Sequence, residues 1–156
     1  MTWSRMSLIG LVLTGACVGE SAVSFEGVLE EHRTEVSGDI LDCGHATVGN
    51  ECRESMSEAE ACIVDAFTRC TAAELRLDVT GTDAAFDVAL FVDVAPDGTC
   101  TVSRFTDHSA DGFKGDYGDY VEQGCAGLAA VVPDTEAGVC AGVTATECAT
   151  REEWYE

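Results

Sequence analysis

Nine cysteines in a chain of 156 residues constrain its fold more than any other feature. The first, Cys17, ends a short apolar segment near the N-terminus. The other eight are spread over the rest of the chain: Cys43, Cys52, Cys62, Cys70, Cys100, Cys125, Cys140 and Cys148. An even set of cysteines in an exported chain is typical of a disulfide framework, whereas one leftover cysteine needs a separate explanation. We therefore predict four disulfides among the eight and a different role for Cys17.

The N-terminal segment has the pattern of a secretory signal. Arg5 is the only charged side chain before Cys17, and the apolar stretch 6–13 follows it. This stretch is much shorter than the roughly 20 residues that a membrane-spanning helix needs, so no transmembrane anchor is expected there. We predict that residues 1–16 are a signal peptide.

The stretch Leu13-Thr14-Gly15-Ala16-Cys17 resembles the lipobox of bacterial lipoprotein precursors, in which small residues precede a cysteine that is acylated on sulfur. The resemblance covers residues 1–17, and it departs from the family pattern at Thr14, where Leu, Val or Ile is usual. It implies that Cys17 becomes the mature N-terminus and carries acyl chains such as palmitate. Ordinary signal cleavage is the alternative, and it would leave Cys17 as a free thiol.

The mature part is similar in style, without a diagnostic motif, to the small cysteine-rich lipoproteins of Gram-negative bacteria such as myxobacteria. This resemblance implies a location and no activity: an exported protein held by lipid at the outer membrane or cell surface. Residues 17–24 would be the lipidated cysteine and a tether, residues 25–150 a single domain, and residues 151–156 a C-terminal tail.

Acidic residues greatly outnumber basic ones. The chain has 29 Asp and Glu against 8 Lys and Arg, a net charge of -21, and loss of Arg5 with the signal would make it -22. Such a surface repels the phosphates of nucleic acid, so nucleic acid is not expected as a partner. It attracts a basic protein partner or a cation. The alternative is an acidic surface that only maintains solubility.

One helix is predicted with a defined start. Ser57 and Glu60 have the spacing of a capping box, and apolar residues recur behind them at helical spacing, which predicts a helix over 58–71. Cys62 and Cys70 are ~12 Å apart along such a helix, too far for a disulfide between them. Each must therefore join the helix to another element, one to a cysteine before the helix and the other to the sheet.

The remaining segments favour strands. After the helix the apolar period changes to 2, and a Pro96-Asp97-Gly98 turn predicts a hairpin. The apolar positions of the stretch 25–40 fit an irregular strand or a short helix about equally, and we take 33–36 as a strand. With it, six segments are taken as strands: 33–36, 74–79, 86–94, 99–105, 127–132 and 139–146. We predict an α+β fold in which one amphipathic helix packs on an antiparallel β-meander and disulfides join the two.

The acidic loop 107–120 is the stretch best suited to a metal site. Its first half has the ligand spacing of an EF-hand calcium loop, but Gly118 stands where the bidentate glutamate belongs. A calcium site of another geometry would take its oxygen ligands from this loop: Asp107, Ser109, Asp111, Asp116 and Asp119. A solvated acidic loop without a ligand is the alternative.

Two classes of function stay open. One is a non-enzymatic binding or structural module with an acidic surface, and the other is an extracytoplasmic hydrolase that uses surface carboxylates. The sequence singles out no catalytic residue, because it lacks a serine hydrolase motif and its carboxylate pairs are too abundant to be informative. A concave pocket with convergent, partly buried carboxylates would favour the enzyme, and a shallow charged face would favour the module.

Overall fold

The computed structural model describes residues 23–36, 38–49, 51–81, 85–110, 118–134, 136 and 140–154. These residues form two helices and six strands, a mostly β member of the α+β class. In chain order they are α1 (Phe25–Glu35), β1 (Leu41–Val48), α2 (Glu58–Arg69), β2 (Ala73–Thr80), β3 (Ala85–Val94), β4 (Cys100–Asp107), β5 (Tyr120–Val131) and β6 (Gly142–Trp154).

The six strands form one mixed sheet in the order β1-β2-β3-β4-β5-β6. β1 and β2 are parallel, and α2 makes the crossover that a parallel pair requires. The other neighbours are antiparallel, including the predicted hairpin of β3 and β4. The expectation of a wholly antiparallel sheet with a single helix is therefore wrong, because β1 adds a parallel edge and the chain before it forms a second helix.

The helix α2 starts as its sequence predicts. The side chain of Ser57 accepts a hydrogen bond from the backbone N–H of Glu60, and the Glu60 carboxylate accepts one from the backbone N–H of Ser57. The helix ends at Arg69, and Cys70 follows in the left-handed conformation. Ile63 and Ala66 are fully buried against the sheet.

The helix α1 is the alternative to the strand predicted at 33–36, and that strand prediction is wrong. Residues 33–36 were predicted as a strand, but Arg33 lies in the last turn of α1 and Val36 is its extended C-cap. The oxygen of Ser24 accepts a hydrogen bond from the backbone N–H of Gly27 at the helix start. Few apolar side chains mark the buried stripe, so a helix and a strand fit this stretch almost equally well.

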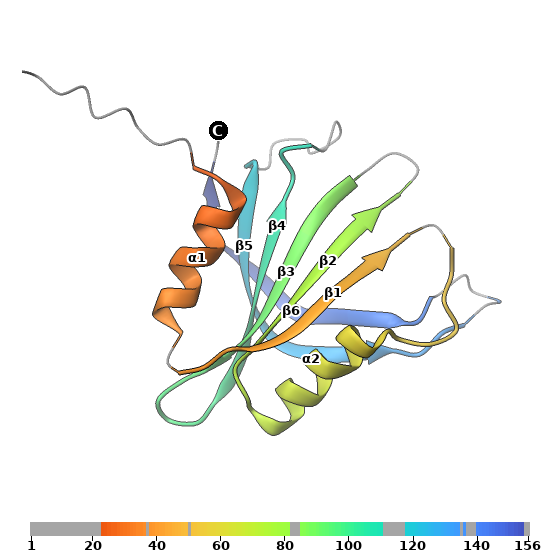
Figure 1. The fold of residues 1–156 in the computed structure, drawn as a ribbon, viewed down its shortest axis with the longest axis horizontal. Helices are drawn as coiled ribbons and strands as arrows, with labels where there is room; N and C mark the ends of the chain where they lie inside the picture. Colours follow the sequence, from red (N-terminus) through yellow and green to blue (C-terminus); the bar gives the residue numbers. More distant parts are fainter. Residues whose placement is uncertain are drawn as a thin grey trace, which may run out of the picture.

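The two helices lie on opposite faces of the sheet (Figure 1). Alternate residues of β3 face the two sides, as its period of 2 predicts. Val88, Leu90 and Val92 belong to the core under α2, whereas Ala89 and Phe91 belong to the core under α1. The sheet bends so that α2 contacts β1, β2 and β3 as well as β5 and β6. We call the side of the sheet that holds α2 the inner face and the side that holds α1 the outer face.

Four disulfides join the eight cysteines of the domain. The pairs are Cys43–Cys62, Cys52–Cys140, Cys70–Cys100 and Cys125–Cys148. Two of them connect the region of α2 to β1 and to β4, which confirms that Cys62 and Cys70 have different partners. The expected C-terminal tail is ordered over residues 151–154, because β6 continues to Trp154 and pairs there with Tyr120.

Candidate functional site

The predicted calcium ligands are only partly within the described residues. Asp107 ends β4, and its carboxylate accepts a hydrogen bond of 2.8 Å from the backbone N–H of Ser109. The backbone N–H of His108 donates to the carbonyl of Asp119 at 2.6 Å, which closes the base of the loop. Asp111 and Asp116 lie outside the described residues, as does the lipidation candidate Cys17.

Within the described ranges, no group of three or more His, Cys, Asp or Glu side chains has the geometry to hold a metal ion. The calcium site therefore stays a prediction. The structure places Asp107 in a different setting, a row of three aspartates on the outer face. Asp78, Asp87 and Asp107 are directly opposite one another on β2, β3 and β4.

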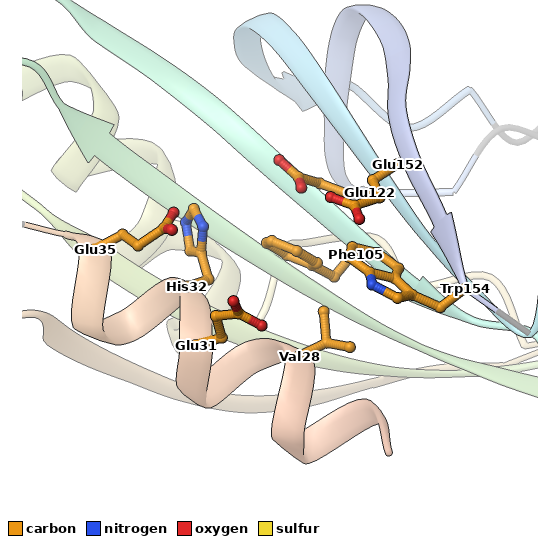
Figure 2. Close-up of a pocket in the computed structure, with 8 residues that line it drawn as sticks. All are labelled: Val28, Glu31, His32, Glu35, Phe105, Glu122, Glu152 and Trp154. Atoms are coloured by element: carbon orange, nitrogen blue, oxygen red, sulfur yellow. The ribbon is translucent and has the colours of Figure 1, made fainter. Parts of the chain in front are cut away.

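The site with the most distinctive chemistry is a cleft between α1 and the outer face of β4, β5 and β6 (Figure 2). It has a volume of about 110 Å³. We call it the α1 cleft, and it is lined by Val28, Glu31, His32, Glu35, Phe105, Glu122, Glu152 and Trp154.

The α1 cleft combines aromatic side chains with carboxylates from both of its walls. Figure 2 shows Phe105 and Trp154 side by side, with carboxylates on α1 below them and on β5 and β6 above them. Glu31, Glu35 and Glu152 are exposed, and none of the three has an ion pair in the part of the chain that the structure describes. The cleft therefore presents unneutralised negative charge beside the half-buried ring of Trp154, with the nearly buried ring of Phe105 in its lining.

The fourth carboxylate of the cleft is neutralised. Glu122 on β5 accepts a hydrogen bond of 3.1 Å from the guanidinium of Arg151 on β6, which also donates to the hydroxyl of Ser103. Arg151 lies directly over Gly124, where any larger side chain would collide with its guanidinium. Glycine at position 124 thus lets Arg151 reach across β5.

A partly buried polar network forms the floor between α1 and the sheet. Nε2 of His32 lies 2.9 Å from Oδ1 of Asp93, and the hydroxyl of Ser103 donates to Oδ2 of the same carboxylate at 2.6 Å. The His32 ring also packs against Phe91 and Phe105, with ring centroids 4.7 and 4.8 Å apart. Because the aspartate lies between the serine and the histidine, this network lacks the serine–histidine hydrogen bond that activates a nucleophile.

Two arginine clusters hold α1 against the strands below it. Arg33 makes two hydrogen bonds to the carboxylate of Glu74, of 2.8 and 2.6 Å, and these bonds raise the pKa of the arginine above its usual value. Arg76 bonds to Glu26, and this hydrogen bond holds the pKa of Glu26 below its usual value. The guanidinium of Arg76 also lies 5.3 Å from the centroid of the Phe25 ring.

The α1 cleft could not be found by reading the sequence. Its residues come from positions 28–35, 105, 122 and 152–154, and two of the segments were assigned to other structures: 33–36 to a strand and 151–156 to a tail. The available signal was the spacing of Glu31 and Glu35, which places both carboxylates on one helical face. That signal applies only once α1 is known to be a helix.

Comparison with protein-family models, with curated proteins and with solved structures finds no match to this chain. Neither helix in the described part of the chain is long and apolar enough to cross a membrane. The function must therefore be argued from the geometry of the site.

Proposed function

We propose that the protein is an exported, lipid-anchored binding module that holds a cationic group of a basic protein partner in the α1 cleft. One observation carries this proposal: three carboxylates without ion pairs among the described residues, Glu31, Glu35 and Glu152, line the same cleft as the rings of Phe105 and Trp154. Carboxylates neutralise a cation, and an aromatic face attracts it through the ring quadrupole. The unpaired carboxylates are exposed rather than buried, which favours a binding surface over an acid–base catalytic pair.

An arginine side chain is the cation that fits best. Its planar guanidinium stacks on aromatic rings and makes paired hydrogen bonds to carboxylates, whereas an ammonium acts as a point charge. The protein already binds one of its own arginines in this way, because Arg76 lies over Phe25 and bonds to Glu26. A volume of about 110 Å³ admits such a group and excludes a large ligand.

Binding in the α1 cleft is tested with a hexaarginine peptide and the fluorescence of Trp154. The chain has two tryptophans, so a Trp3→Phe background leaves Trp154 as the only one. We expect a saturable change in Trp154 emission as the peptide is added, and a weaker response to hexalysine. Absence of any saturable change at low ionic strength would refute the proposal.

Two matched double variants distinguish binding in the α1 cleft from nonspecific attraction of the peptide to the negative net charge of the protein. The double substitution Glu31→Gln, Glu35→Gln is expected to weaken hexaarginine binding about 2- to 30-fold, since exposed ion pairs contribute about 0.2–1 kcal/mol each. The control Glu51→Gln, Glu54→Gln removes the same charge from the exposed segment between β1 and α2. If both double variants lower the affinity for hexaarginine equally, the peptide binds through the net charge of the protein alone.

The location is part of the proposal and has separate support. The signal-like N-terminus and the lipobox-like stretch ending at Cys17 indicate lipidation, and four disulfides are typical of an oxidising compartment. Residues 18–24 span at most about 25 Å when extended, so a lipid on Cys17 would keep the start of α1 close to the membrane surface.

Intact mass spectrometry of the membrane fraction, with and without reduction, tests the location. We expect a mature N-terminus at Cys17 with added acyl mass, and a gain of eight hydrogens when the four disulfides are reduced. The variant Cys17→Ser should move the protein to the soluble fraction. A wild-type protein that is already soluble and unmodified at Cys17 would rule out the anchor.

A further inference from the structure

A second cavity lies on the inner face of the sheet, away from the α1 cleft. It has a volume of about 230 Å³, and eight of its ten lining residues are apolar. We call it the inner groove, and it is lined by Val48, Leu77, Val79, Phe86, Val88, Leu90, Arg104, Val143, Thr144 and Ala145. All of the apolar residues belong to the core cluster under α2 or pack against it.

Arg104 is the one charged side chain among the residues that line the inner groove. It is in register with Leu90 on β3 and with Gln123 on β5, so neither strand neighbour carries a negative charge. Alternation along β4 places Arg104 on the same face as Val102, which is fully buried in the core under α2.

Arg104 differs from every other arginine in the described part of the chain. The other five each have a carboxylate partner: Arg33, Arg53, Arg69, Arg76 and Arg151. Within the described residues, Arg104 makes no side-chain hydrogen bond or ion pair. Burial lowers the pKa of Arg104 below its usual value, and no neighbouring carboxylate acts against this effect.

An unpaired cation among apolar side chains is costly. Arg104 is half-buried, so its charge is partly removed from water without a partner, which destabilises the folded state. In this protein 29 acidic residues were available to neutralise it. A groove that combines many apolar residues with one positive charge is complementary to a molecule with the opposite charge at one end and an apolar body.

We propose that the inner groove binds a small amphiphile with an alkyl chain and one carboxylate, whose charge Arg104 neutralises. The alkyl chain would lie along Leu77, Val88 and Val143, and the carboxylate would accept hydrogen bonds from the guanidinium of Arg104. The volume of about 230 Å³ is below the usual range for ligand pockets, about 300–1,000 Å³, so a short chain of about eight carbons is the appropriate probe.

This inference is independent of the α1 cleft. The two cavities share no residue, they lie on opposite faces of the sheet, and they select opposite charges. Failure of one proposal therefore leaves the other intact.

The head-group preference is measured by isothermal titration calorimetry with three probes of equal chain length: octanoate, 1-octanol and octylammonium. The protein is the full chain carrying Cys17→Ser, so that no attached acyl chain competes for the groove. We expect octanoate to bind about 10- to 100-fold more tightly than octanol, since a hydrogen bond to a charged group contributes about 1.5–3 kcal/mol. Octylammonium should bind more weakly than either.

Three substitutions locate the binding and keep the test decisive. Arg104→Met retains an apolar body of similar length, and it should abolish the preference for octanoate over octanol. Because it removes an unpaired charge, this variant should also melt at a higher temperature than the parent chain. Arg69→Met, on the exposed surface of α2, is the matched control and should leave octanoate binding unchanged.

Val143→Trp fills the groove and should block octanoate as well as octanol. Three results would overturn the proposal: no octanoate binding, equal affinity for octanoate and octanol in the parent chain, or octanoate binding that survives in both Arg104→Met and Val143→Trp. The last result would place the ligand elsewhere on the surface.

Discussion

Asp78 and Asp87 are directly opposite one another on β2 and β3, and Asp107 is opposite Asp87 on the next strand. Burial raises the pKa of Asp87, and the negative charges of Asp78 and Asp107 raise it further. Like charges in directly opposed positions destabilise a sheet. This row therefore opposes folding at neutral pH.

Replacing Asp87 should stabilise the protein. Because the pKa of Asp87 is higher in the folded state than in the unfolded chain, stability falls as the pH rises through that pKa. Asp87→Asn removes the repulsion, so its free energy of unfolding at pH 7 should exceed that of wild type by about 0.5 kcal/mol. Urea denaturation should show this advantage shrinking as the pH falls towards 4. A destabilised Asp87→Asn would mean that the attraction between Asp87 and Arg76 outweighs the repulsion in the row.

Glu60 has the opposite pH dependence. Its side chain is buried, and burial alone would raise its pKa, but hydrogen bonds from Ser57 and Arg53 lower the pKa below the ordinary value of 4.5. The stability that these bonds provide is present above pH 4.5 and is lost as the pH falls through the folded-state pKa.

The variant Glu60→Gln should unfold with a free energy about 2 kcal/mol lower than wild type at pH 7, because Arg53 loses its charged partner. Glutamine still suits the capping position, so the helix start should persist in circular dichroism. The difference from wild type should narrow at pH 3.5. Glu58→Gln, an exposed change in the same turn, is the control and should cost less than 0.5 kcal/mol.

The disulfides should differ in their contribution to stability. Cys52–Cys140 closes a segment of 88 residues, whereas Cys43–Cys62 closes one of 19. The chain-entropy relation gives about 4.5 kcal/mol for the longer loop and about 3 kcal/mol for the shorter one. Replacing both cysteines of each pair with serine and comparing guanidinium denaturation midpoints tests this order. A greater loss from the shorter loop would indicate residual structure in the unfolded chain.

The sequence predicted those parts of the fold that local chemistry determines. The capping box at Ser57 gave the start of α2, and the alternation from Phe86 to Val94 gave both faces of β3. β1 was missed because its parallel pairing with β2 depends on the α2 crossover and is interrupted by a bulge after Asp42. No local pattern reports such long-range pairing.

The two cavities were harder to predict than the strands that line them. Arg104 stands at an inward position of the predicted strand 99–105, and a charged residue at such a position was the available signal. Whether Arg104 has a carboxylate partner depends on the residues that β3, β5 and β6 place around it. Those residues are determined by the pairing of strands that lie far apart in the sequence. The same holds for Glu31 and Glu152, which meet across the α1 cleft from positions over 100 residues apart.

The attachment of α1 to the sheet should depend on Asp93. Its carboxylate accepts hydrogen bonds from Ser103 and from His32, and it is the link between α1 and β3 at the floor of the α1 cleft. In Asp93→Asn one acceptor oxygen becomes a donor, so one of the two bonds is lost at a cost of about 1–2 kcal/mol.

This loss should act locally, because α1 is held to the sheet by a small cluster of side chains. Hydrogen exchange in α1 should therefore be faster in Asp93→Asn, while exchange in α2 stays unchanged. Binding of hexaarginine should weaken with it, since α1 forms one wall of the cleft. Asp39→Asn, an exposed aspartate between α1 and β1, is the control for loss of charge. Equal exchange in α1 for wild type and Asp93→Asn would show that the arginine clusters alone hold the helix in place.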